Sequence, residues 1–133
     1  MIFMLDTNIC IYLIKKKPAR VLEKLKEFNI GDFSISSVTL AELEYGVKKS
    51  KFEAQNRVAL TNFLAPFEIL PFGQSAAIEY GKIRANLEKR GQIIGAYDLM
   101  IGAHARAEKL TLVTNNIKEF KRVTDLQVEN WVQ

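Results

Sequence analysis

Short apolar runs alternate with longer segments of helical periodicity along this chain of 133 residues. The short runs lack a regular change between apolar and polar residues, which is typical of strands buried on both faces of a parallel sheet. The following segments are predicted as strands, the last of them at an edge of the sheet: 2–5, 33–36, 67–70, 111–113 and 126–132.

Between these strands, apolar residues recur at three- and four-residue spacing, as in helices with one buried face. Helices are predicted over 9–14, from Pro18 to Gly31, from Ser37 or Thr39 to Val47, and over 52–65, 73–90 and 96–107. Strands that alternate with helices favour an α/β sandwich with a mainly parallel sheet. The length favours a single domain over 1–133.

Polar residues follow several predicted strands directly. Asp6 comes after the first strand, Ser36 ends the second, and the segment 114–116 follows the fourth. Binding sites in parallel sheets form at the carboxyl ends of the strands. We therefore expect these residues on one rim of the sheet.

Three acids are candidates for a functional site: Asp6, Glu42 and Asp98. Asp6 lies between two apolar triplets, and Asp98 precedes the apolar triplet 99–101, so both belong to segments that should be buried. Buried carboxylates are costly, and clustered ones repel each other unless they share protons or hold a cation. A divalent metal ion would remove this cost.

Each acid also has a local explanation that involves no chemistry. Asp6 could cap the first helix, Glu42 could complete a capping box with Thr39, and Asp98 could favour the positive end of its helix. Beside Asp98 on the same helix face lie Gly102 and Ala105, which are too small to fill the space over it. We expect another group to occupy that space.

The other metal-binding residue types are scarce. His104 lies about 120° around the helix from Asp98 and is interpreted as packing or surface, and Cys10 as a small core residue. One cysteine excludes an intrachain disulfide and a cysteine-based zinc site, and it fits a reducing cytoplasm. Oxygen ligands without histidine or thiolate select Mg²⁺ or Mn²⁺.

The composition is that of an ordinary folded protein, and its charge favours a polyanionic partner but also fits a plain basic protein. The apolar fraction is 48%, the charged fraction is 26%, and the net charge of +4 gives a pI near 9.2. No apolar run reaches the roughly 20 residues of a membrane span, and the apolar opening segment lacks a basic leader, so we assign it to the fold. Carboxylates around Mg²⁺ with a basic surface predict metal-assisted hydrolysis of a nucleic acid.

Four blocks of sequence occur in the order expected for PIN-domain nucleases: MLDTNICIYLI, SISSVTLAELEYGV, IGAYDLMIGAHA and LVTNNIKEF. Over essentially its whole length, the chain resembles this family, and most closely the VapC-type toxins, the ribonuclease halves of type II toxin–antitoxin pairs. The resemblance implies a three-layer α/β/α PIN fold, a homodimer and dependence on Mg²⁺ or Mn²⁺. It also implies cytoplasmic endoribonuclease activity on structured RNA, most strongly on transfer RNA.

Carried over by position, the resemblance implies that Asp6 and Asp98 bind the metal directly. Glu42 would bind it through water or orient the attacking water. The residues expected to support these acids by hydrogen bonds are Thr7, Asn8 and Thr114.

The chain departs from the family pattern at the fourth acid that many members carry after the last core strand. Asn116 stands in that region and could coordinate through its amide oxygen without adding charge. Glu119 lies beyond it and is interpreted as a solvated residue beside Lys118. A second metal ion is therefore not expected unless Glu119 reaches inward or an RNA phosphate completes the site.

The resemblance also implies an antitoxin whose extended or helical tail lies in a groove near the active site. The predicted helices 52–65 and 73–90 carry apolar positions for such a groove or for a dimer face. Two other functions stay open on the same fold: a structure-specific DNA nuclease and a non-catalytic RNA-binding module. A phospho-receiver domain is disfavoured, because its early acid pair is absent.

Overall fold

A five-stranded parallel sheet forms the centre of the protein. The structure, a computed structural model, describes residues 1–132. The strands are β1 (Phe3–Leu5), β2 (Phe33–Ser36), β3 (Glu68–Leu70), β4 (Thr111–Val113) and β5 (Val128–Glu129). They lie in the order β3-β2-β1-β4-β5, and every pairing is parallel. The expected sheet is confirmed, although edge strand β5 is shorter than the predicted 126–132.

The helices also follow the predicted order. They are α1 (Thr7–Lys15), α2 (Ala19–Leu25), α3 (Ser37–Lys49), α4 (Glu53–Leu64), α5 (Gln74–Lys89), α6 (Ala96–Ala107) and α7 (Ile117–Phe120). Helix α2 ends well before Gly31, and the short helix α7 and the 3₁₀ turn Ile30–Asp32 were not predicted. Among residues 1–132, no helix is long and apolar enough to cross a membrane.

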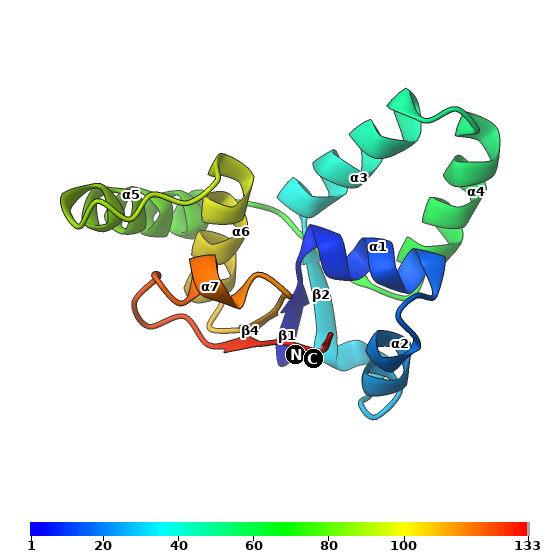
Figure 1. Cartoon of the computed structure of the whole chain (residues 1–133), viewed down its shortest axis with the longest axis horizontal. Coiled ribbons are helices and arrows are strands. Elements are labelled where there is room, and N and C mark those ends of the chain that lie inside the picture. Colours follow the sequence, from blue (N-terminus) through cyan, green and yellow to red (C-terminus); the bar gives the residue numbers. More distant parts are fainter. Residues whose placement is uncertain (133) are drawn as a thin grey trace.

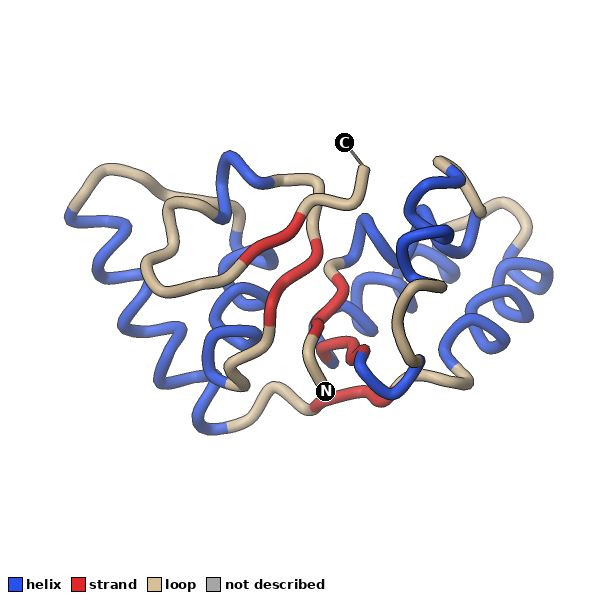
Figure 2. Tube along the Cα trace, turned by 90° about the horizontal axis from the view of Figure 1, so that it is seen from below, coloured by secondary structure: helices blue, strands red, loops and turns tan. Residues whose placement is uncertain are grey.

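Helices cover both faces of the sheet. Helices α1 to α4 lie on one side and α5 to α7 on the other (Figure 1), and the strands run between the two groups in Figure 2. Alternate residues of β1 supply the two cores: Phe3 and Leu5 join the core under α1 to α4, while Met4 joins the core under α5 and α6. The predicted α/β/α sandwich is therefore confirmed.

The register of the sheet brings its polar strand ends together. Leu5 of β1 pairs with Ile35 of β2 and with Val113 of β4. The residue that follows each of these three in the chain is polar and buried: Asp6, Ser36 and Thr114. The expected polar rim is therefore present, with the backbone N–H of Asp6 donating to the carbonyl of Val113 at 3.1 Å.

Candidate active site

Asp6 is a buried carboxylate at the end of the central strand, with an exposed fraction of 3%. Its Oδ1 accepts the backbone N–H of Ile9 at 2.9 Å and so caps α1. Burial raises the pKa of Asp6 from 3.8 to about 6, against the lowering effect of hydrogen bonds from Thr114 and Ile9. The charges of Asp98 and Glu42 raise this pKa further, which shows that the three acids share one electrostatic environment.

Asp98 faces the same environment from the first turn of α6. Burial again is the largest cause that raises its pKa to about 6, followed by the charge of Glu119. The side-chain amide of Asn116 donates to Oδ2 of Asp98 at 3.4 Å, which lowers the pKa. Two carboxyls with pKa values raised in this way favour a proton or a cation between them.

Glu42 reaches the site from α3. The hydroxyl of Thr7 donates to Oε1 of Glu42 at 2.6 Å, and the Thr7 oxygen lies 3.3 Å from the hydroxyl oxygen of buried Thr39. The capping-box alternative for Glu42 is wrong, because Ser36 caps this helix through the N–H of Val38. The local explanation for Glu42 therefore disappears.

Glu119 also belongs to this cluster, so the interpretation of a solvated residue beside Lys118 is wrong. It lies in the first turn of α7 and accepts a hydrogen bond from the side-chain amide of Asn116. It is half-buried and close enough to Asp98 to raise the pKa of that carboxyl. Asn116 thus joins Glu119 to Asp98 through one amide group.

The space beside Asp98 on α6 is filled by the protein itself. A side chain at Gly102 would meet the ring of Phe120 at 3.2 Å, and Phe120 is fully buried. At Gly102, the expectation of another group over this face is therefore met by Phe120 of α7 rather than by a ligand. This packing holds α7, and with it Glu119, against α6.

The predicted supporting residues differ in their surroundings. Thr7 holds Glu42, and buried Thr114 donates to Asp6 while accepting the backbone N–H of Asn116 at 2.9 Å. Asn8 is exposed and lines a cleft beside the acids. Its side chain makes no hydrogen bond within residues 1–132, so the support expected from Asn8 is not seen.

His104 and Cys10 lie in the core, as expected. Nδ1 of His104 lies 2.8 Å from the hydroxyl of Ser36, whereas Nε2 is buried without a hydrogen bond in the described part of the chain. Burial lowers the pKa of His104, so the imidazole is neutral near pH 7. It connects α6 to the residue that caps α3.

The fit of this site to a metal ion depends on its oxygen donors. Within residues 1–132, no three His, Cys, Asp or Glu side chains lie close enough to form one metal site. A direct cage of Asp6, Glu42 and Asp98 is therefore not present. Mg²⁺ keeps several water ligands and binds through one or two carboxylates, and the buried Asp6 with the half-buried Asp98 fits such an ion.

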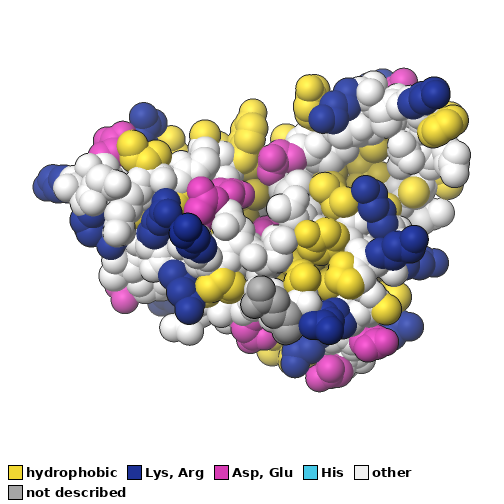
Figure 3. All heavy atoms as spheres, in the orientation of Figure 1, with side chains coloured by type: hydrophobic (Ala, Val, Ile, Leu, Met, Phe, Trp, Pro, Cys, Tyr) yellow, Lys and Arg dark blue, Asp and Glu magenta, His cyan; other side chains and the backbone are white. Residues whose placement is uncertain are grey.

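Positive charge predominates in the part of the chain outside the acid cluster. Without Asp6, Glu42, Asp98 and Glu119, the chain has 19 Lys and Arg against eleven remaining Asp and Glu, an excess of eight. Figure 3 shows acidic side chains in the middle of one face, between the helical layers, with Lys and Arg groups to either side. A polyanion would meet attractive charge around an acidic centre.

Sequence reasoning missed the exposed residues beside the acids. A cleft of about 650 Å³ opens next to Glu42, and Tyr45, Lys49 and Tyr97 contribute to its lining. The helical spacing of Tyr45 and Lys49 places them on one face of α3. Nothing in the local pattern relates them to Tyr97, because the cleft is formed only when α3 and α6 come together.

Comparisons with known proteins agree with this geometry. The family model described as PIN domain matches residues 3–126. A Rickettsia felis protein named Ribonuclease VapC2 is 52% identical over 134 residues, which cover 98% of each chain. A Shigella flexneri protein named tRNA(fMet)-specific endonuclease VapC is 46% identical over 97% of each chain.

A solved structure shares the whole fold. It is the crystal structure of VapBC2 from Rickettsia felis bound to a DNA fragment from their promoter. The similarity has a TM-score of 0.91 at 49% identity and covers 98% of this chain and 99% of that one. The likeness therefore extends over both helical layers and the sheet between them.

Proposed function

Because this chain belongs to the PIN-domain family and, within it, to the VapC ribonucleases, we propose that it is the toxin of a type II toxin–antitoxin pair. It is an endoribonuclease that hydrolyses phosphodiester bonds in structured RNA. The observation that carries this function is the cluster of acids at the strand ends, in which burial and mutual repulsion raise the pKa of Asp6 and Asp98 to about 6.

PIN-domain ribonucleases are metal-dependent, and we propose Mg²⁺ or Mn²⁺ as the ion for this chain. Asp6 and Asp98 would hold it, since both offer hard oxygen donors in a negatively charged setting that is buried at Asp6 and half-buried at Asp98. When bound, the ion supplies Lewis-acid activation of water and neutralises charge on the phosphate. Asn116 and Glu119 adjust the position and charge of the Asp98 carboxylate.

Glu42 has the position of a residue that orients the attacking water. Its Oε1 is occupied by the Thr7 hydroxyl at 2.6 Å, which fixes the carboxylate and leaves Oε2 to accept a proton from water. Thr114 has a corresponding effect on Asp6, since its hydrogen bond favours the ionised carboxylate that binds a cation. Thr7 and Thr114 therefore hold the two carboxylates in position before RNA binds.

Transfer RNA is the proposed substrate. The Shigella flexneri relative is named for tRNA(fMet), and the basic excess outside the acid cluster suits a folded polyanion. Such a substrate is met in the cytoplasm, where we expect the protein to act.

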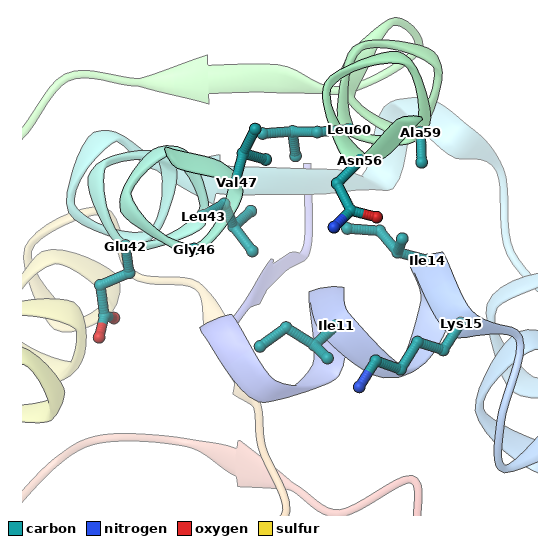
Figure 4. A pocket seen from close by; sticks show the side chains of 10 residues that line it. All are labelled: Ile11, Ile14, Lys15, Glu42, Leu43, Gly46, Val47, Asn56, Ala59 and Leu60. Carbon is teal, nitrogen blue, oxygen red and sulfur yellow. The ribbon is translucent and has the colours of Figure 1, made fainter. Parts of the chain in front are cut away.

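The proposed antitoxin site is an apolar groove between α1, α3 and α4. Figure 4 shows apolar side chains of these helices facing a pocket of about 290 Å³, with Glu42 at one end and Lys15 at the other. The groove and the cleft beside the acids share Ile11, Glu42 and Gly46. An amphipathic segment in the groove could therefore extend a basic side chain toward the acids.

We also propose a homodimer, with α5 and the segment after it as the contact. Ile78 and Ile93 are 52% and 66% exposed there, and no residue of α5 lines the antitoxin groove. Sedimentation of the wild type and of Ile78→Glu tests this assembly.

Digestion of total cellular RNA tests the nuclease. Purified protein, free of antitoxin, is incubated with RNA and Mg²⁺ or Mn²⁺, beside an EDTA control and Asp6→Ala, and new RNA ends are mapped. Discrete metal-dependent cuts that are absent with Asp6→Ala are expected. Cutting of DNA alone would favour the DNA nuclease, and tight RNA binding insensitive to metal and to Asp6→Asn would favour the binding module.

A further inference from the structure

Two exposed tyrosines line the cleft beside the acids. Tyr45 of α3 is 65% exposed and Tyr97 of α6 is 59% exposed, although aromatic side chains are generally buried. Both contribute to the same cleft of about 650 Å³ as Glu42 and Thr7. Tyr97 is also the immediate neighbour of Asp98 in the sequence. The aromatic surface is therefore next to the site where the bond would be cleaved.

The rest of the cleft provides polar groups and free space. Nζ of Lys49 lies 5.0 Å from the centre of the Tyr45 ring, so a positive charge accompanies the aromatic surface. Gly46 also lines the cleft, and because it has no side chain it leaves open space on α3. Asn8 is exposed in the same cleft, and its amide can both donate and accept hydrogen bonds. None of these groups is needed to hold the core together.

We propose that this cleft binds one unpaired nucleotide of the RNA next to the cleaved bond. The base stacks on the rings of Tyr45 and Tyr97, and Lys49 binds the neighbouring phosphate. Aromatic side chains bind splayed-out bases by stacking, and lysine supplies the charge that attracts the backbone. The inference rests on the proposed ribonuclease function and adds to it the residues that bind the nucleotide beside the cut.

A nucleotide fits this cleft better than a second copy of the chain does. Glu42 and a lysine line both surfaces, but the groove between α1, α3 and α4 is otherwise mainly aliphatic, whereas the cleft adds the exposed rings of Tyr45 and Tyr97. The apolar groove between α1, α3 and α4 is the better surface for a protein partner. The two surfaces therefore suit different ligands.

The test uses the RNA stem-loop that carries the mapped cleavage site. Tyr97→Ala and Tyr45→Ala should each raise KM at least about fivefold, the lower end for loss of one base–aromatic stack, and Tyr→Phe at either position should restore it. Phe52→Ala is the matched control, because Phe52 is 61% exposed beside a lysine but lies outside the cleft. Its KM should equal that of the wild type.

A modified RNA separates stacking from a structural effect. An abasic residue beside the cleaved bond should raise KM for the wild type but not further for Tyr97→Ala. A 2-aminopurine at that position should be quenched on binding to inactive Asp6→Asn, and less so when Tyr97→Ala is added.

Unchanged KM and quenching in both tyrosine variants would overturn the nucleotide site, as would a loss that follows a change in oligomeric state by sedimentation. In those cases the wild type still cleaves RNA and the proposed function stands. If the wild type cleaves no RNA, both proposals fail together.

Discussion

Neutralising Asp6 should stabilise the metal-free protein. Its pKa rises from 3.8 to about 6 on folding, so the folded state disfavours the carboxylate by about 3 kcal/mol at 1.36 kcal/mol per pKa unit. Asp6→Asn removes the charge and keeps an Oδ1 that can cap Ile9. The pKa of about 6 already includes the favourable hydrogen bond from Thr114 to the carboxylate, so we expect a net gain of about 3 kcal/mol at pH 7.5.

The pH dependence of this gain has a defined sign. Below pH 3.8 the Asp6 carboxyl is protonated in both the folded and the unfolded state. Its burial should therefore not make the wild type less stable than Asp6→Asn. Between 3.8 and about 6 the unfolded chain releases the proton first, and the stability of the wild type falls as pH rises. The difference between the proteins should therefore be small at pH 4 and complete above pH 7.

Urea unfolding in EDTA at pH 4, 5.5 and 7.5 measures the effect, with Glu23→Gln as the control because Glu23 is an exposed acid outside the site. In Mg²⁺ the difference in stability between Asp6→Asn and the wild type should shrink or change sign, because an ion at 100 times its Kd stabilises the wild type by about 2.7 kcal/mol. An Asp6→Asn protein less stable than wild type by the same amount at every pH would refute the reasoning.

Two further substitutions test how the acids are held. Thr7→Val keeps the shape but removes the donor to Glu42, so kcat for RNA cleavage should fall about tenfold with little change in KM, measured in steady state. Phe120→Ala should lower the free energy of unfolding by about 3–5 kcal/mol, because Phe120 is fully buried against Gly102. Urea unfolding measures the loss, and a value under 1 kcal/mol would contradict the packing.

The elements and the rim could be predicted because they depend on local patterns. Unbroken apolar runs indicate strands buried on both faces, and parallel pairing then places Asp6 and Thr114 at one edge. The same reasoning could not find α7, since a helix of four residues is too short for a periodic signal. Without α7, no local pattern in the sequence indicated that Glu119 lies near Asp98.

The small residues beside Asp98 show how the same observation supports different conclusions. Gly102 does create space on α6, as the sequence indicated, but Phe120 fills it from the segment that follows β4. Local spacing gives the shape of one helix face, whereas the occupant depends on a contact between distant segments. The exposed tyrosines of the cleft were missed for the same reason.

Helix capping and the proposed catalytic role are compatible at Asp6 and separate at Glu42. One oxygen of Asp6 caps α1 through Ile9, and the same carboxyl is buried at the rim with a raised pKa, so capping positions the carboxylate for its proposed role. At α3 the N-cap is Ser36, so Glu42 does not cap the helix and instead accepts a hydrogen bond from Thr7. A cap at a strand end is therefore a reason to look for a site there, because the hydrogen bond that starts the helix also fixes the carboxylate.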